Sequence, residues 1–480
     1  MTQLHIHYIL RPARYALLAA SMVGLTRPAS AQQLTSAEIA SIDSVFARFD
    51  HTWSPGCAMG VVRRGRLVFS RGYGMANLEH NIALTDRSVF RIGSVSKQFT
   101  AAAIALLAQD GALALDDDVR RFIPELPEYG HRVTIRHFLN HTSGIRDYLT
   151  VMYLAGYRDD DWYTNQDVID ILVQQNELNF DPGDEYLYSN AGYFLLSVIV
   201  ERASGQSLRE FAAARMFEPL GMMDSHFQDD HTYVVPQRAT GYAPTRDGTF
   251  RISMTTLDMV GDGGVFTTVQ DLAKWDHNFY TPTVGGQRLL GDMHTQAVLN
   301  DGDTLTYALG LGVTEYRGLE VVQHGGAFVG FRAQLMRFPT QQLSVICLCN
   351  LSATNPTRLS HGVVDILLGD LLAPREDRTA GGGEQPEEAT SSVASPPTSE
   401  LRQFTGRYYA PELDATYEIT LESDSLNVSV GNDIDGVLEF LGDDRFDRDG
   451  IVFRFQRAGD RIIGFRLDAG RVKNLWFEKQ

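Results

Sequence analysis

Ser94-Val95-Ser96-Lys97 is the most informative stretch of this chain, because it places a hydroxyl and an amine three residues apart. An apolar run typical of a buried helix, from Phe99 to Ala108, follows. If this helix begins near Ser94, the side chains of Ser94 and Lys97 lie one turn apart on the same face. A serine hydroxyl attacks only when a neighbouring base takes its proton, and an amine can be that base. The spacing therefore predicts a nucleophilic serine, although such a match alone is common.

A second motif, Tyr188-Ser189-Asn190, stands at the mouth of a helix that we expect over residues 190–203. A phenol beside a lysine ammonium can lose its proton more easily and then relay one. The Asn190 amide can orient both Lys97 and a substrate amide. Tyr163-Thr164-Asn165 has the same spacing. We favour Tyr188 because it follows the Pro182-Gly183 turn at the start of an apolar helix.

A third motif, His324-Gly325-Gly326-Ala327, lies in a strand-rich part of the chain. Paired glycines in a strand let another backbone or a ligand approach closely. The backbone N–H of Ala327, together with that of Ser94, can then hold a developing oxyanion.

In order and spacing, these three motifs resemble those of the serine β-lactamases and penicillin-binding D,D-peptidases, in the class C β-lactamase-like branch. Three further stretches also look like that family: residues 138–144, 218–222 and 261–266. The resemblance implies Ser94, Lys97 and Tyr188 as catalytic residues, and Asn190, His324, Gly326 and Ala327 as substrate-binding residues. It implies an acyl-enzyme on Ser94 and needs neither a metal nor another cofactor.

This chain departs from the class C β-lactamases at one motif, and the difference affects the substrate that we expect. Class C β-lactamases carry Lys-Thr-Gly where this chain has His324-Gly325-Gly326. A histidine is a weaker, pH-dependent anchor for a substrate carboxylate. The departure favours the esterase, D-aminopeptidase and D,D-peptidase branches, so we expect a D-amino-acid peptide or a small ester as substrate. β-Lactam hydrolysis is the alternative, and a non-catalytic penicillin-recognising or ligand-binding protein is an alternative of another class.

Two other hydrolase classes fit less well. An α/β-hydrolase needs Gly-x-Ser-x-Gly, which the chain lacks around its serines. A zinc protease needs His-Glu-x-x-His, whereas His137 and His141 have the spacing but no glutamate between them.

The pattern of elements predicts an α/β (α+β) fold, with an antiparallel sheet flanked by helices and an inserted helical region. Strands are expected at residues 57–62, 67–72, 307–313, 320–323, 331–338 and 343–350, and helices at both ends of this set, at 34–49 and 355–371. We therefore expect a serine hydrolase domain over residues 32–373. A Gly-, Glu-, Ser- and Pro-rich linker over 374–400 leads to a small all-β, lipocalin-like barrel over 401–480.

Residues 1–31 have the pattern of a cleavable signal peptide, with two arginines before a short apolar stretch and Ala29-Ser30-Ala31 after it. We expect a periplasmic or secreted protein without a stable membrane span.

The formal net charge of −18 argues against a nucleic-acid partner, so we expect a small-molecule or peptide substrate. The oligomeric state is left open. Three cysteines are too few for a disulfide scaffold, and Cys347 and Cys349 are expected in the core.

Overall fold

A computed structural model describes residues 33–158, 161–374, 396–431 and 433–480. The predicted signal peptide and most of the predicted linker lie outside these residues. Among the described residues, none of the helices combines the length and the apolar character that crossing a bilayer requires.

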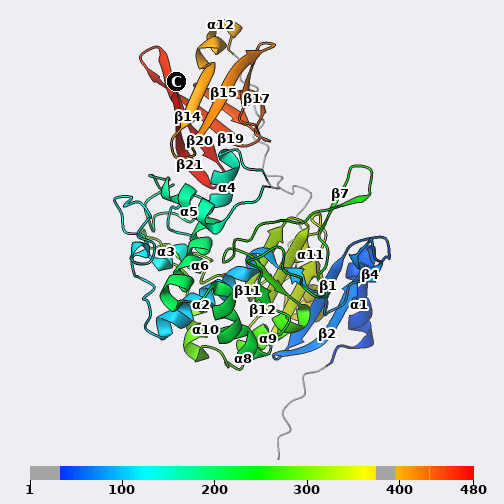
Figure 1. The fold of residues 1–480 in the computed structure, drawn as a ribbon. Helices are drawn as coiled ribbons and strands as arrows, with labels where there is room; N and C mark the ends of the chain where they lie inside the picture. Colours follow the sequence, from blue (N-terminus) through cyan, green and yellow to red (C-terminus); the bar gives the residue numbers. More distant parts are fainter. Residues whose placement is uncertain (1–32, 159–160, 375–395, 432) are drawn as a thin grey trace, which may run out of the picture.

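The two ends of the catalytic region build one antiparallel sheet, as expected. Within the described residues its strand order is β10-β11-β12-β13-β1-β2, so strands from residues 57–73 pair beside strands from residues 312–349. Figure 1 shows this as blue strands next to yellow-green ones. The strands are β1 (Cys57–Arg63), β2 (Arg66–Tyr73), β10 (Gly312–Tyr316), β11 (Leu319–Phe328), β12 (Phe331–Phe338) and β13 (Leu343–Cys349).

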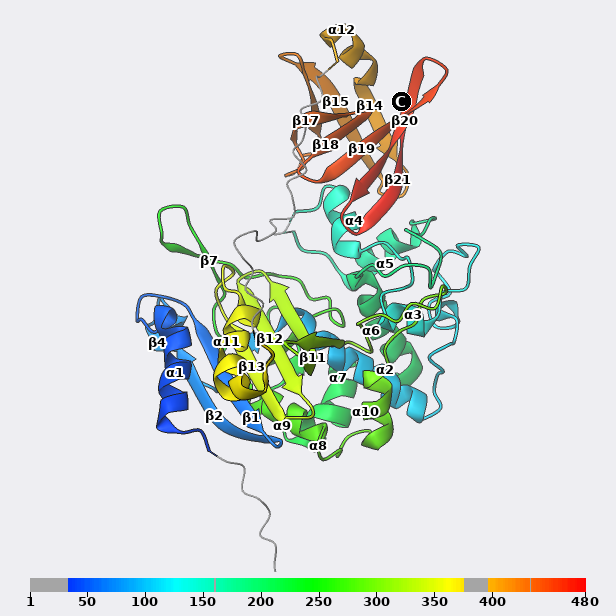
Figure 2. The same ribbon diagram turned by 180° about the vertical axis from the view of Figure 1, so that it is seen from behind.

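Alternation of side chains along β1 gives the sheet two buried faces. Cys57, Met59 and Val61 belong to one apolar cluster, which also holds residues of α1 (Ser36–Phe46) and α11 (Pro356–Leu368). Ala58 and Val62 belong to the other cluster, on the side of α9 (Val269–Asn278) and α2 (Lys97–Gln109). Helices thus cover both faces, which is the flanked sheet that the sequence predicts (Figures 1 and 2).

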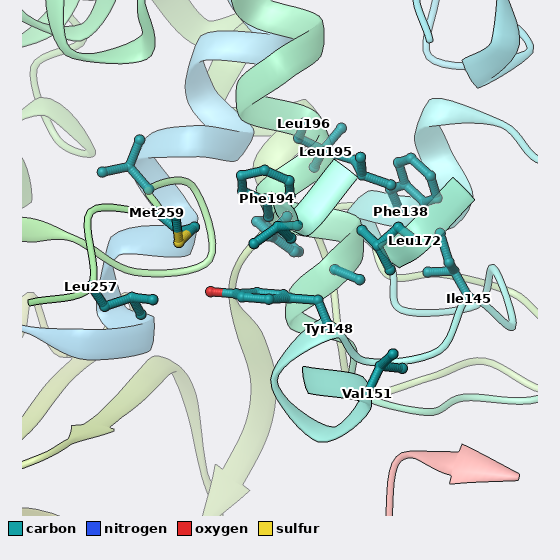
Figure 3. Packing of buried hydrophobic residues seen from close by; sticks show 14 of the residues in the cluster. Phe138, Ile145, Tyr148, Val151, Leu172, Phe194, Leu195, Leu196, Leu257 and Met259 are labelled. Carbon is teal, nitrogen blue, oxygen red and sulfur yellow. The ribbon is translucent and has the colours of Figure 1, made fainter. Parts of the chain in front are cut away.

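The inserted region is mainly helical and buries its own apolar core. In Figure 3, Tyr148 lies among Ile145, Val151 and Phe194, and its hydroxyl is directed at the loop that carries Leu257 and Met259. The helices are α3 (Ile135–Leu139), α4 (Tyr148–Leu154), α5 (Asn165–Val173), α6 (Asn190–Ser204), α7 (Leu208–Ala212), α8 (Glu218–Leu220) and α10 (Gly286–His294). Short strands complete it: β3 (Met75–Asn77), β4 (Ile82–Ala83), β5 (Phe90–Arg91), β6 (His226–Phe227), β7 (Tyr242–Pro244), β8 (Phe250–Ile252) and β9 (Val265–Thr267).

One expected strand is misplaced. The sequence predicts a strand over 307–313, but the chain turns at Gly310, where φ is +70°, and β10 begins only at Gly312. A Cβ at Gly310 would lie 2.7 Å from the carbonyl oxygen of Lys97, so the turn packs directly on the start of α2. Tyr307, expected in the strand, therefore lies before this turn.

Two of the three cysteines form a disulfide that the sequence did not predict. Cys57 on β1 and Cys349 on β13 are register partners, and their sulfurs are bonded. The count of cysteines could not reveal this pair, because it depends on β1 and β13 being neighbours. Cys347 is a buried free thiol on the same face of β13, as the strand alternation predicts.

The C-terminal part is a closed eight-stranded barrel, as expected. Aromatic rings fill its interior: the Tyr417 and Phe465 rings each lie 4.5 Å from the Phe477 ring, between centroids. A short helix, α12 (Thr398–Leu401), precedes it. The strands are β14 (Gly406–Ala410), β15 (Ala415–Glu422), β16 (Ser425–Ser429), β17 (Gly436–Gly442), β18 (Arg445–Arg448), β19 (Ile451–Ala458), β20 (Arg461–Ala469) and β21 (Val472–Lys479).

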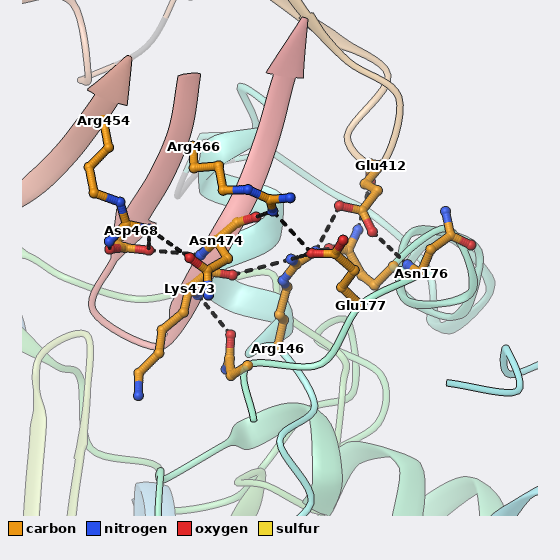
Figure 4. A network of polar contacts seen from close by, with 11 residues as sticks. Arg146, Asn176, Glu177, Glu412, Arg454, Arg466, Asp468, Lys473 and Asn474 are labelled. Atoms are coloured by element: carbon orange, nitrogen blue, oxygen red, sulfur yellow. Dashed lines mark hydrogen bonds and ion pairs between the residues drawn. The ribbon is translucent and has the colours of Figure 1, made fainter. Parts of the chain in front are cut away.

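The barrel docks on the helical region through polar contacts (Figure 4). The Arg146 side chain is fully buried and donates to Glu412 Oε2 at 2.8 Å and to the Lys473 carbonyl oxygen at 3.2 Å. Glu412 Oε1 accepts from the Asn176 backbone N–H at 2.6 Å. Because both groups are desolvated, removing either one would deprive a buried charge of its shortest ion-pair contact.

Candidate active site

Ser94 and Lys97 meet at the start of α2, as the motif predicts. A 3-10 turn over Gly93–Ser96 leads into α2, of which Lys97 is the first residue. Lys97 Nζ lies 3.3 Å from Ser94 Oγ, within hydrogen-bonding distance. The lysine is thus placed to take the proton of the serine hydroxyl.

Lys97 is held in the interior by two more oxygens. Its Nζ donates to Asn190 Oδ1 at 2.9 Å and to the Asp262 carbonyl oxygen at 2.6 Å. Burial lowers the pKa of Lys97 to about 8, although the charges of Asp262 and Asp147 act in the opposite direction. The positive charge of Arg471 adds to the lowering. A lysine with this pKa is partly neutral near physiological pH and can serve as a base.

Tyr188 packs beside Lys97, with Nζ 4.7 Å from the centroid of its ring. Burial raises the pKa of Tyr188 well above its usual value, and the Ser94 hydroxyl and the Arg471 charge lower it only in part. The sequence interpretation, that a neighbouring ammonium makes this phenol acidic, is therefore wrong in direction. A protonated Tyr188 is instead suited to donate a proton.

His141 supports Tyr188 from behind. Its ring lies 4.1 Å from the Tyr188 ring between centroids, and its Nδ1 accepts from the backbone N–H of Ser189 at 3.1 Å. Burial keeps the pKa of His141 well below its usual value, so the imidazole is neutral. Through these contacts it positions the Tyr188 segment.

His324 lies on β11 as a neutral, fully hydrogen-bonded ring. Its Nδ1 lies 2.6 Å from the Gly325 carbonyl oxygen and must donate there, because a carbonyl oxygen only accepts. Its Nε2 then accepts from the Tyr307 hydroxyl at 2.9 Å. Burial lowers the pKa of His324 to about 4. His324 therefore brings no positive charge to the site at neutral pH.

The two proposed oxyanion donors come from segments in direct contact. A Cβ at Gly326 would lie 2.0 Å from the Ile92 carbonyl oxygen and 3.2 Å from the Ser94 backbone nitrogen. A Cβ at Gly93 would lie 2.9 Å from the Ala327 backbone nitrogen. Only glycine allows β11 to pass this close to the turn that carries Ser94.

Two pockets open at the serine, and Ser94, Tyr188, Ala327 and Arg471 line both. The first, of about 200 Å³, is also lined by Asn190, and its remaining walls are Arg91, Gly93, Leu149, Leu257, Met259, Asp262, Gly263 and Phe328. The second, of about 430 Å³, lies against His324 and Gly326 and is completed by Gly325, Arg332, Ala333, Pro356 and Thr357. The structure thus brings together all seven residues that the sequence selects for the site.

Sequence reasoning missed several residues of this cleft. Asp262 lies in a stretch that already resembles the family, so that stretch was a usable signal for it. Tyr307 was expected in a strand instead. Arg471 comes from the turn between β20 and β21 of the barrel, and no pattern within the catalytic region could have pointed to it.

Comparison with known proteins agrees with this geometry. Penicillin-binding protein 4* of Bacillus subtilis is 31% identical over 311 residues, which is 60% of this chain and 66% of that protein. A D-aminopeptidase of Gluconobacter oxydans is 28% identical over 65% of this chain and 58% of its own length. The chain therefore spans about three fifths to two thirds of these relatives.

Solved structures share the fold. The octameric penicillin-binding protein homologue from Pyrococcus abyssi superposes with a TM-score of 0.62 and 23% identity, over 92% of this chain and 99% of that one. The D-amino acid amidase from Ochrobactrum anthropi SV3 gives a TM-score of 0.58 and 22% identity, over 70% and 100%. The profile of the Beta-lactamase family matches residues 42–369, and the chain belongs to that family.

Proposed function

We propose that this chain is an exported serine hydrolase that cleaves an amide or ester next to a D-amino acid through an acyl-enzyme on Ser94. The observation that carries this is the placement of Lys97, a buried amine hydrogen-bonded to Ser94 Oγ, with its pKa lowered to about 8. A buried amine with this pKa, touching a serine, is an activated nucleophile pair.

In the first half-reaction, Ser94 Oγ bonds to the substrate carbonyl carbon, and its proton passes to Lys97 Nζ. The carbonyl oxygen becomes an oxyanion, held by the backbone N–H groups of Ser94 and Ala327. The bond from carbon to the leaving group then breaks. Tyr188 gives its proton to the departing amine or alcohol, and the Lys97 ammonium restores that proton. Ser94 is left as an ester and both other groups return to their starting states.

In the second half-reaction, water replaces the leaving group. Its oxygen bonds to the acyl carbon, one of its protons passes to the Lys97 amine, and the bond to Ser94 Oγ breaks. Ser94 regains a proton through the same pair, and the acid is released. The Asn190 side chain holds Lys97 in place throughout, through its Oδ1.

Two observations support a D-amino-acid substrate over a β-lactam. Several relatives are D-aminopeptidases, including that of Gluconobacter oxydans. His324 occupies the place of a cationic lysine and is neutral.

The disulfide between Cys57 and Cys349, with the predicted signal peptide, supports export, because such bonds persist in oxidising compartments.

A substrate panel with matched variants tests this function. The panel holds a D-aminoacyl anilide and its L-isomer, a p-nitrophenyl ester, D-Ala-D-Ala and nitrocefin. We expect cleavage of the D-anilide and a covalent adduct on Ser94 by mass spectrometry. Ser94→Ala and Lys97→Ala should each lose about 10²–10⁴-fold in kcat. Ser44→Ala and Lys274→Ala, at residues that line neither pocket, should keep full activity.

The panel also separates the alternatives. Preferred turnover of nitrocefin would replace the peptidase assignment with a β-lactamase. Equal inertness of wild type and Ser94→Ala on every substrate would favour a non-catalytic binding protein. Full activity in Lys97→Ala would remove the proposed base.

A further inference from the structure

Arg471 belongs to the barrel but lies in the active-site cleft. It follows β20 at the turn into β21, and its guanidinium carbon is 4.8 Å from the centroid of the Tyr188 ring. It lines both pockets beside Ser94. Arg471 is therefore a cation that lies beside both the proposed proton donor and the reacting serine, where it can contact the substrate.

The turn that carries Arg471 is fixed by the catalytic domain. The Asn179 side chain donates to the Arg471 carbonyl oxygen at 2.9 Å and accepts from the Lys473 backbone N–H at 2.7 Å. Arg146 adds a hydrogen bond to the Lys473 carbonyl oxygen, near the centre of the network in Figure 4. These contacts hold the backbone that directly follows the Arg471 Cα, so the side chain starts from a defined position.

The guanidinium retains free donors. Its Nη1 lies 3.5 Å from Asp147 Oδ2, at the limit of an ion pair's useful range, and 41% of its side chain is exposed. The same Asp147 oxygen already accepts from the Asn190 backbone N–H at 2.6 Å. Asp147 therefore orients Arg471 without saturating it, since a guanidinium has five N–H donors.

Besides Arg471, the second pocket has one other charged residue among the described ones, Arg332 of β12. His324 is neutral, and no acidic residue is among the described residues that line this pocket. The Nη1 of Arg332 donates to the carbonyl oxygens of Val329 and Phe331, which leaves its guanidinium fewer available donors than that of Arg471. The β11 strand thus presents no cation beside Ser94, whereas the barrel does.

We propose that Arg471 is the carboxylate anchor of this active site, supplied by the barrel, and that it selects D-peptides whose free carboxylate lies next to the scissile bond. The inference rests on the proposed function. It adds which residue binds the substrate and that the substrate carries a negative charge next to the scissile bond. An arginine suits this role because its planar fork binds both oxygens of a carboxylate at once. The smallest such substrate is a D,D-dipeptide.

The test compares two substrates that differ only in one charge, D-Ala-D-Ala and its C-terminal amide. Arg471→Met keeps an unbranched apolar stem and removes the guanidinium. A matched control is Arg466→Met, which removes another barrel arginine, ion-paired with Glu177 at 3.2 Å and outside both pockets. The full-length protein is used throughout, and kcat/KM is measured for both substrates.

We expect wild type to prefer the acid over the amide. In Arg471→Met this preference should fall about 10- to 100-fold, the scale of one charged hydrogen bond. The loss on the amide should be clearly smaller than the loss on the acid, and a melting temperature like that of wild type shows that the variant is folded. Arg466→Met should keep the wild-type preference. An unchanged preference in Arg471→Met, or equal losses on both substrates, would overturn the proposal.

Failure of the proposed function gives a different result. If Ser94-dependent cleavage of the D-anilide is present but wild type prefers the amide dipeptide, the anchor is wrong and the function stands. If wild type cleaves nothing, the function fails and the anchor is judged by calorimetry with the two dipeptides. Tighter binding of the acid that is lost in Arg471→Met then supports the anchor, and equal affinities refute it.

Discussion

At the residue scale, the chemistry depends on one buried amine. Lys97 is fully buried, and its Nζ contacts three oxygens, of Ser94, Asn190 and Asp262. None of the three contacts is itself to a carboxylate, so desolvation dominates and favours the neutral amine. The same burial raises the pKa of Tyr188, so its phenol keeps its proton. One environment therefore makes the lysine a base and the tyrosine an acid.

The pH dependence of activity follows from this. Only neutral Lys97 can take the Ser94 proton, so kcat/KM on an uncharged ester should rise with pH and level off above about 8. The charged groups that act on Lys97 are Asp262 and Asp147, which raise its pKa, and Arg471, which lowers it. A pH–rate profile between about pH 5 and pH 10 checks this. A profile that falls through that range would contradict the assignment, and Lys274→Ala should leave the profile unchanged.

At the element scale, the important feature of β11 is that its backbone passes close to the turn that carries Ser94. Its middle carries two adjacent glycines with different surroundings. A Cβ at Gly326 would meet the fixed Ile92 carbonyl oxygen at 2.0 Å, whereas one at Gly325 would meet the end of the Gln334 side chain at 3.1 Å. The first obstacle is backbone and cannot move, but the second is the tip of a flexible side chain.

The pair gives a matched test of the oxyanion site. Gly326→Ala should push β11 away from Ser94 and lower kcat by about 10²-fold or more, the usual effect of losing one oxyanion donor. Gly325→Ala should retain most of the activity. Steady-state kinetics with the D-anilide measures both, alongside melting temperatures. Equal activity in the two variants would argue against a role for the Ala327 N–H.

Single elements also show how far sequence reasoning reaches. The strand over 331–338 and the hairpin around residue 64 follow from local alternation and turn residues, and the structure confirms them. The Ser94–Lys97 contact follows from helical spacing. Tyr307, the Cys57–Cys349 bond and Arg471 do not, because each depends on which distant segments become neighbours. The local periodicity of a sequence does not show which distant segments will become neighbours.

At the scale of the whole molecule, the barrel and the catalytic domain share a buried ion pair. Arg146 and Glu412 belong to different domains, and Arg146 has no exposed surface. At the rim, Lys473 and Glu185 form a similar pair at 2.8 Å, but 53% of the Glu185 side chain is exposed. The two pairs both join the barrel to the catalytic domain and differ above all in burial.

Their removal should have unequal effects. Glu412→Ala leaves the buried Arg146 with only the more distant Glu177, at 3.8 Å, as a charged partner, so we expect it to lower the free energy of barrel docking and unfolding by about 3 kcal/mol. Glu185→Ala should cost less than about 1 kcal/mol, as is usual for exposed pairs. Urea denaturation and limited proteolysis between the domains measure both changes. Equal midpoints for the two variants would refute the central role of the Arg146–Glu412 pair.

The strand order also governs when the catalytic domain can form during synthesis. β1 lies between β2, its immediate successor, and β13, so one edge of β1 remains unpaired until β13 has been made. The paired residues Cys57 and Cys349 are 292 positions apart. At usual translation rates that interval lasts about 15–60 s. The strand order thus delays the last pairing of β1, an apolar strand, until nearly the whole catalytic domain has been made.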